Sequence, residues 1–146
     1  MVGIPISAHT QLTAEDRADL ETSRKWVKGH FTEAASEKYD PISGKLRVID
    51  AVLKSGWVEP TETWKLQSLG VAFGDALAQE LLLEWVVVED EIGRSVALNW
   101  PGTSVYSFPM TMISKRIENG ETADVSQLFE AVCADLRDMA FSGRYV

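Results

Sequence analysis

Cysteine is almost absent from the chain, since Cys133 is the only one among 146 residues. No disulfide can form within the chain, which favours a reducing compartment. The first residues carry neither a basic segment nor an apolar run of the kind found in a secretory signal. No stretch approaches the roughly 20 apolar residues that a membrane-spanning helix needs. We therefore expect a cytoplasmic protein that does not associate with membranes.

Positive charge is also scarce. Asp and Glu number 22 against 14 Lys and Arg, so the formal net charge is −8. The only basic doublets are Arg24-Lys25 and Lys115-Arg116. Binding to the phosphates of DNA or RNA requires clustered Lys and Arg that displace counterions. The composition therefore disfavours nucleic-acid binding, whereas an acidic surface can steer a protein towards a basic partner.

Motifs of known catalytic chemistry are missing. The chain has no G-x-S-x-G turn, and its glycines do not form a phosphate-binding or dinucleotide-binding loop. Cys133 has no plausible histidine partner in the sequence. The acids between residues 84 and 91 lack the spacing of a calcium loop and are expected to face water. We expect no catalytic residue, no cofactor and no metal site.

The chain does contain enough apolar material for a core. Hydrophobic residues make up 45% of the sequence, and five residues are tryptophan. These values fit a folded globule, and a chain of this length can bury a core without disulfides. We expect a loose N-terminal arm over residues 1–12 and a single domain over residues 13–146.

The stretch 66–90 organises the rest of the chain. Apolar residues recur in it at spacings of three and four, as on one face of a helix: Leu66, Leu69, Phe73, Leu77 and Leu81. Gly70 and Gly74 form a second stripe on this helix. Each glycine costs a helix up to about 1 kcal/mol relative to alanine. The stripe therefore predicts close packing by another element, with an opening for a ligand or partner as the alternative.

Three strands are predicted after this helix. Residues 84–89 are apolar on both faces, residues 95–100 alternate between apolar and polar, and residues 103–108 form a third run. Gly93 suits a hairpin loop of three to five residues between the first two strands. A proline-glycine turn signal separates the last two. The pattern predicts a three-stranded antiparallel β-meander.

Helices are predicted on both sides of the meander. In chain order they are a long helix from a cap at Thr13 to about Lys38, a helix over 42–55, the central helix from Thr61 or Thr63, a short helix after Pro109, and a last helix from Thr122 or Asp124 to about Ala140. Their apolar faces and caps follow the usual helix signals. The predicted fold class is α+β, with three N-terminal helices, the meander and two C-terminal helices.

Several short motifs fall within about residues 66–121: Leu69-Gly70, Gly74-Asp75, Leu81, Trp85, Val88, Asp90-Glu91, Gly93, Ala97-Leu98, Pro109, Ile113-Ser114-Lys115-Arg116 and Gly120-Glu121. On these residues the chain resembles an uncharacterised bacterial family, domain of unknown function 3806. The helices before and after this block match only in general character. The resemblance implies no reaction, cofactor or known site.

One group of mixed charges is the candidate contact site for a ligand or partner: Asp90, Glu91, Arg94, Lys115 and Arg116, with Asp75 as an outlier. If the short helix folds back over the hairpin, its two basic residues can reach the loop acids. Such a cluster can bind an anionic small molecule or orient a proton transfer. The alternative is a surface salt-bridge cluster, in which each exposed pair contributes about 0–1 kcal/mol.

Three functions remain open from the sequence. Small size, acidity and the lack of catalytic motifs favour a non-catalytic module that binds a basic protein partner, for example an immunity or inhibitor protein that neutralises a toxin. The alternative is a small-molecule binder or enzyme with its site near the hairpin and Lys115-Arg116. A homodimer is the third, because the sequence does not tell whether Trp26, Trp57 and Trp64 are buried within one chain or between two.

Overall fold

The computed structural model describes residues 9–142 apart from residue 92. In chain order its elements are α1 (Ala14–Lys28), α2 (Ala35–Tyr39), α3 (Ile42–Ser55), α4 (Thr63–Leu81), β1 (Glu84–Glu89), β2 (Arg94–Asn99), β3 (Tyr106–Ser107), the 3-10 helix η1 (Pro109–Thr111), α5 (Met112–Glu118) and α6 (Val125–Phe141). The three strands form one antiparallel sheet in the order β1-β2-β3. The predicted α+β fold class and the meander are confirmed.

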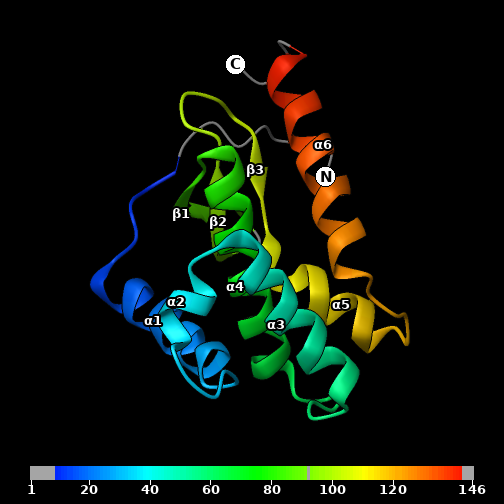
Figure 1. The fold of residues 1–146 in the computed structure, drawn as a ribbon. Coiled ribbons are helices and arrows are strands. Elements are labelled where there is room, and N and C mark those ends of the chain that lie inside the picture. The colour runs from blue at the N-terminus through cyan, green and yellow to red at the C-terminus, as the bar shows by residue number, and fades with distance from the viewer. Residues whose placement is uncertain (1–8, 92, 143–146) are drawn as a thin grey trace.

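Helix α4 lies at the centre of the molecule (Figure 1). It contacts α1, α3, α5, α6 and η1. The apolar face predicted from the sequence is buried in the main core, with Leu66, Leu69 and Phe73 fully enclosed. Leu98 of β2 belongs to the same core, so the sheet and the surrounding helices cover α4 together.

The glycine stripe of α4 is a seam of close packing, as predicted. A Cβ atom on Gly70 would lie 2.6 Å from the Cα atom of Met110. A Cβ atom on Gly74 would lie 2.5 Å from the ring of Trp85 and 2.7 Å from Pro109. Neither distance leaves room for a side chain, so both glycines let η1 and β1 approach the helix backbone.

The first hairpin forms where the sequence predicts it. Glu89 pairs with Arg94, which leaves a four-residue loop over 90–93. The third strand is shorter than the predicted run 103–108, because residues before it are used in a turn. The side-chain amide of Asn99 donates to the carbonyl oxygens of Thr103 and Val105, at 3.0 and 3.2 Å. Because residues up to Val105 take part in this turn, the part of the run that pairs with β2 is Tyr106–Ser107.

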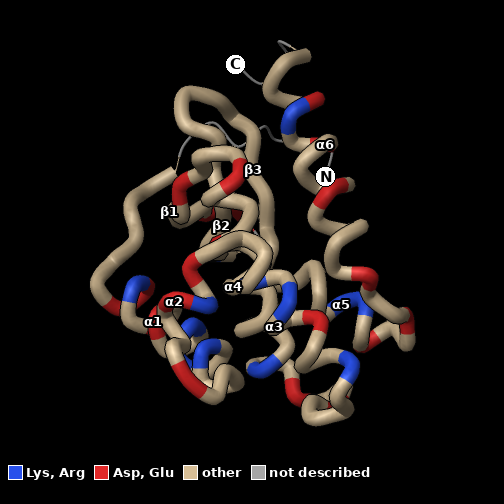
Figure 2. Tube along the Cα trace, in the orientation of Figure 1, with Lys and Arg blue, Asp and Glu red and all other residues tan. Residues whose placement is uncertain are grey.

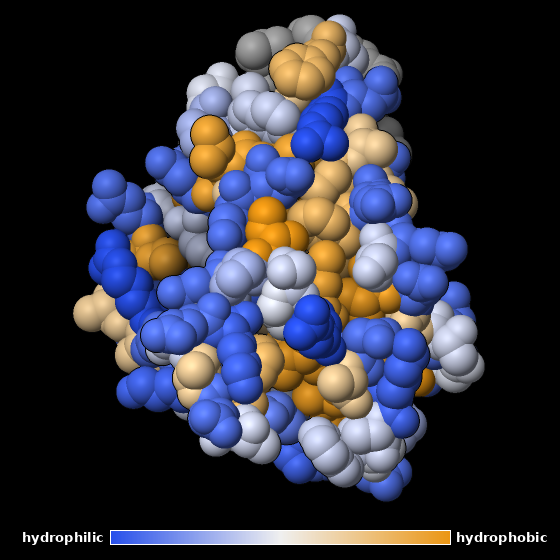
Figure 3. All heavy atoms as spheres, viewed as in Figure 1, coloured by the Kyte–Doolittle hydropathy of each residue, from blue (hydrophilic) through white to orange (hydrophobic). Residues whose placement is uncertain are grey.

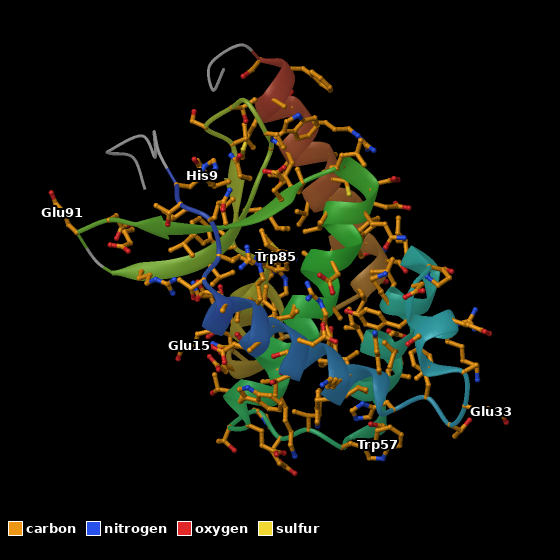
Figure 4. The ribbon with its side chains drawn as sticks, turned by 90° about the vertical axis from the view of Figure 1, so that its left-hand side faces the viewer. His9, Glu15, Glu33, Trp57, Trp85 and Glu91 are labelled. Atoms are coloured by element: carbon orange, nitrogen blue, oxygen red, sulfur yellow. The ribbon has the colours of Figure 1, made fainter. Side chains whose placement is uncertain are left out.

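The N-terminal arm is attached to the sheet at one residue. Thr10 and Val87 exchange two backbone hydrogen bonds of 2.9 Å, on the edge of β1 opposite β2. His9 lies beside the sheet (Figure 4), and its Nδ1 atom is 2.8 Å from the Tyr106 hydroxyl. The first eight residues of the predicted loose arm lie outside the described residues.

The long helix predicted from Thr13 to about Lys38 is wrong in its second half. Helix α1 begins at Ala14 after the expected cap at Thr13, but it ends at Lys28, before Gly29. The chain then turns, and Ala34 takes a left-handed φ of 53° before α2 begins. Glycine disfavours helix continuation, and the predicted helix runs past Gly29. The consequence is a separate short helix that places Tyr39 against α4.

No helix in the described part of the chain is long and apolar enough to cross a membrane. Figure 3 shows apolar atoms between α4 and α6 and at the C-terminal end of α6, separated by hydrophilic surface. Helix α1 carries both acidic and basic positions (Figure 2), whereas α3 carries three basic residues, Lys45, Arg47 and Lys54, and one acidic residue, Asp50.

Candidate functional site

Asp75 on α4 is the centre of a polar network that joins four elements. Arg24 of α1 binds it through two hydrogen bonds, Nε to Oδ2 at 2.7 Å and Nη2 to Oδ1 at 2.8 Å. The Tyr39 hydroxyl of α2 donates to Oδ2 at 2.7 Å, and Trp85 Nε1 of β1 donates to Oδ1 at 3.0 Å. Trp85 lies between the sheet and α4 (Figure 4).

The donors around Asp75 leave it no free acceptor position. A carboxylate offers about four lone-pair sites, and each Asp75 oxygen already accepts two hydrogen bonds. The hydrogen bond to Asp75 raises the pKa of Arg24, and burial together with the neighbouring Asp75 charge raises the pKa of Tyr39. Arg24 therefore stays charged and Tyr39 stays protonated, so both remain donors.

Lys45 extends this network under Tyr39. Its Nζ atom donates to the carbonyl oxygens of Tyr39 and Asp40 at 2.9 and 2.6 Å, and to Gln79 Oε1 at 2.7 Å. An ammonium group has three donors, and all three are used here. Burial lowers the pKa of Lys45. The network fixes α2 between α3 and α4, which is a structural role.

A second arginine–aspartate pair joins α1 to β2. Arg94 binds Asp16 through Nη1 to Oδ1 at 2.8 Å and Nη2 to Oδ2 at 2.6 Å. The hydrogen bond from Arg94 and that from the Thr13 backbone hold the pKa of Asp16 well below its usual range. Asp16 and Thr13 also form a capping box, with the Asp16 backbone N–H donating to Thr13 Oγ1 at 3.1 Å.

The predicted charged group is divided among separate places. Asp75 pairs with Arg24, and Arg94 pairs with Asp16, as described above. Asp90 accepts a hydrogen bond from the Gly93 backbone at 3.0 Å within the hairpin loop.

Glu91 points away from the molecule at the hairpin tip (Figure 4). Among the described residues, no ion pair joins Lys115 or Arg116 to the hairpin acids. Arg116 instead donates from Nη1 to the Met112 carbonyl oxygen at 3.0 Å. The structure therefore does not bring the six predicted residues into one cluster.

Lys115 and Arg116 line a groove between β3, α5 and α6, which we call the α5–α6 groove. Its volume is about 390 Å³, and its lining includes Phe108, Met112, Lys115, Arg116, Leu136 and Met139. Phe108 and Met139 are each 38% exposed. Most of the lining is apolar, and the two basic residues stand on its α5 side.

Sequence reasoning did not place a row of four rings at the other end of the molecule, which we call the aromatic row. Trp57 stacks on His30 with ring centres 5.8 Å apart, His30 meets Trp26 at 4.6 Å, and Trp26 meets Trp64 at 5.9 Å. Trp57 is 63% exposed and Trp64 is 49% exposed. Trp57 lies at the edge of the fold in Figure 4.

One feature of the sequence indicated an exposed ring: Trp57 lies in the short connector before α4. A tryptophan between two helices has few neighbours to cover it. Trp64 follows at the start of α4, but Trp26 and His30 come from α1 and the turn after it, about 30 residues earlier in the chain than Trp57. Their meeting depends on how α1 packs on α4, which local patterns do not reveal.

The aromatic row borders a hollow of about 420 Å³ between α1, α4 and β2, which we call the acidic hollow. Trp64 lines it together with Asp16, Asp19 and Arg94. Arg94 is paired with Asp16, which leaves the exposed Asp19 as the uncompensated charge in this group. The hollow therefore combines an indole ring with net negative charge.

Among the described residues, no group of three or more His, Cys, Asp or Glu side chains is placed to hold a metal ion. Cys133 is buried on α6, and burial raises the pKa of its thiol. A raised pKa keeps a thiol protonated and poorly nucleophilic, which agrees with a packing role for Cys133.

The family profile of Domain of unknown function (DUF3806) matches residues 45–129, which is more than half of the chain. The chain belongs to this family. The matched region contains the 66–121 block whose motifs resemble the family, and it extends beyond that block on both sides. It contains Asp75 and Trp85, while Arg24 and Tyr39 lie before it. For DUF3806 no function is defined, so membership does not select among the candidate functions.

A solved crystal structure from Bacteroides thetaiotaomicron VPI-5482 has a similar fold, with a TM-score of 0.66 and 15% sequence identity. The similarity covers 84% of this chain and 45% of that chain, so this DUF3806 chain spans less than half of the other protein's length. At this identity the similarity shows the fold alone. No curated protein matches the sequence.

Proposed function

We propose that this DUF3806 protein is a non-catalytic protein-binding module that meets a basic partner through the aromatic row. The observation that carries the proposal is the exposure of Trp57 and Trp64 at 63% and 49% in one connected row of rings. Tryptophan is enriched among the residues that contribute most to protein–protein binding. Its exposure at a surface is a common mark of such an interface.

The packing of the row supports a preformed binding surface. The half-buried Trp26 and His30 contact the exposed rings from the inner side. Rings held by neighbours lose little conformational freedom when a partner binds, and that reduces the entropic cost of association. A partner that covers Trp57 and Trp64 would therefore gain from apolar burial on a surface that needs little rearrangement.

The charge around the row supports a basic partner. Asp19 lines the acidic hollow with Trp64, and Glu59 occurs in the connector between Trp57 and Trp64, where the neighbouring Glu62 is paired with Lys65. An arginine or lysine of a partner can contact an indole face and a carboxylate at the same time. The net charge of −8 would also accelerate the encounter with such a partner at low salt. An immunity or inhibitor protein is one concrete form of this proposal.

The interior charges support a non-catalytic role. Asp75, Lys45 and Asp16 have their donor or acceptor positions engaged by neighbouring side chains and backbone groups. A general base or nucleophile needs a position that can reach substrate. The hydrogen bonds of Asp16 and the burial of Lys45 explain the lowered pKa values of these two side chains without a reaction.

The test is affinity capture from the native lysate with wild-type protein and two variants as bait. Trp57→Ala/Trp64→Ala removes the exposed rings, and Phe141→Ala removes a 77% exposed ring from the far end of α6 as a matched control. We expect a basic protein held at low salt and released at high salt by wild type and Phe141→Ala, and lost from the double variant.

An empty wild-type bait, or equal capture by the double variant, would contradict the proposal. Light scattering over a concentration series separates self-association from partner binding. A wild-type dimer that the double variant abolishes would assign the row to a homodimer instead.

A further inference from the structure

We propose that the α5–α6 groove binds a small amphiphilic anion, an unbranched apolar chain that ends in a carboxylate. The site is independent of the aromatic row, which lies on α1, the turn after it, the α3–α4 connector and the first turn of α4. Three features of the groove carry the inference: its apolar walls, the balance of charge in its lining and a buried hydroxyl that has no partner.

The walls of the groove suit an apolar chain. Met112 of α5 faces Leu136 and Met139 of α6 across it, and Phe108 stands beside them. The 38% exposure of Phe108 and Met139 leaves apolar surface in water that a bound chain would cover. Methionine side chains are flexible and fit ligands of varied shape. The volume of about 390 Å³ is at the small end of ligand pockets, which favours a single chain.

The charge of the lining selects an anion. Lys115 and Arg116 are its basic residues, and Asp135 is the acidic one. The Lys115 ammonium is exposed and makes no hydrogen bond or ion pair with any described residue. Arg116 uses one donor on the Met112 carbonyl and retains other guanidinium donors. The groove is locally positive, although the protein has a net charge of −8. A carboxylate would complement this local positive charge.

Ser107 of β3 is one of the residues that line the groove. Its residue is 5% exposed, and its hydroxyl has no hydrogen-bond partner among the described residues. Ser107 pairs with Leu98 across the sheet, so its side chain lies on the same face as Leu98, which packs in the main core with Leu136 of α6. A buried hydroxyl without a partner is uncommon, and a ligand oxygen would supply one.

Isothermal titration with sodium decanoate tests the site, at concentrations below those at which decanoate aggregates. Decanol supplies the same chain without the charge, and acetate supplies the charge without the chain. We expect decanoate to bind once per chain, with decanol at least tenfold weaker and acetate without measurable binding. Lys115→Ala/Arg116→Ala should weaken decanoate at least tenfold and leave decanol unchanged.

Two further variants separate the groove from general charge effects. Lys54→Ala removes an exposed lysine from α3, outside the groove lining, and should leave decanoate binding unchanged. Ser107→Ala should weaken decanoate a few-fold without lowering the thermal midpoint. Equal binding of decanoate and decanol, or decanoate binding unaffected by Lys115→Ala/Arg116→Ala, would overturn the proposal. Binding to anionic vesicles without binding of monomeric decanoate would overturn it as well.

Discussion

Around Asp75, charge is enclosed and paired, whereas along the α5–α6 groove two cations stand beside apolar walls with few partners. Asp75 accepts four hydrogen bonds from Arg24, Tyr39 and Trp85. Lys115 makes no ion pair with the described residues, and Ser107 has an unpartnered hydroxyl. Both regions contain mixed polar and apolar side chains. Around Asp75 every acceptor position of the carboxylate is occupied, whereas the groove retains donors that a ligand can use.

This difference separates polar groups that hold the fold from those available for binding. A charge in the interior costs solvation free energy and persists only when its neighbours satisfy it. A charge at the surface keeps its water and is free to exchange that water for a ligand. Substitutions in the two regions should therefore affect different measurements: stability for the first and affinity for the second.

The largest expected effect on stability comes from Asp75→Asn. An amide keeps the shape of the side chain but removes the charge that compensates Arg24. Breaking one partner of a buried pair costs about 3–5 kcal/mol, and the lower end applies because the Arg24 side chain is 23% exposed. Urea unfolding measures this loss, and Glu80→Gln, on the exposed side of the same helix, is the control. A loss below about 1 kcal/mol would assign Asp75 a minor structural role.

Gly70→Ala should have the next largest effect. Alanine is the better helix former by about 1 kcal/mol, so an unhindered site would gain stability. Here the new Cβ would meet the Met110 backbone at 2.6 Å, and overpacking of this kind costs about 1–3 kcal/mol. Thermal unfolding by circular dichroism should therefore show a lower midpoint for Gly70→Ala. A raised midpoint would mean that η1 can move away from α4 at little cost.

A smaller, pH-dependent effect is expected for Arg94→Gln. The pKa of Asp16 is lowered by folding, so the native state binds fewer protons than the unfolded state as pH falls. The stabilisation is present above the ordinary aspartate pKa of about 4 and is lost as pH falls through the lower native value. Wild type should exceed Arg94→Gln in stability at pH 7, and the gap should close in acid. A gap that stays constant from pH 7 to pH 2 would exclude Asp16 as its source.

Lys115→Ala should have the smallest effect on stability. Exposed side chains away from caps, cores and networks change stability within about 0.5 kcal/mol. Differential scanning calorimetry should therefore give nearly the same midpoint for Lys115→Ala and wild type, although the substitution weakens decanoate. A midpoint lowered by more than 4 °C would place Lys115 among the residues that hold α5 in place.

The sequence predicted the centre of the fold because its signals are local. The spacing of Leu66, Leu69 and Phe73 and the cap at Thr13 act within a few residues, and they predicted α4 and the start of α1. The Gly70–Gly74 stripe also predicted close packing, although not its partner. The end of α1 was missed because a helical apolar pattern continued past Gly29, which stops the helix.

The polar network could not be predicted because its members are distant in the chain. Asp75 is 51 residues from Arg24 and 36 from Tyr39. Asp75 was named as an outlier of the charged group, and nothing local linked it to α1. Lys115 and Arg116 were noticed as a basic doublet, and their contact with the loop acids depended on the condition that α5 folds back over the hairpin. Helix α5 packs on α4 and η1 instead.

We propose that the Asp75 network stabilises the fold whereas the aromatic row binds the partner. One capture experiment with three baits tests this division between the two regions. Wild type, Asp75→Asn and Trp57→Ala/Trp64→Ala are compared side by side, at a temperature well below the unfolding midpoint of Asp75→Asn. We expect Asp75→Asn to retain the captured basic protein despite its lower stability, and the double tryptophan variant to lose it while keeping a near wild-type midpoint. Loss of capture by folded Asp75→Asn together with retention by the tryptophan variant would contradict this division.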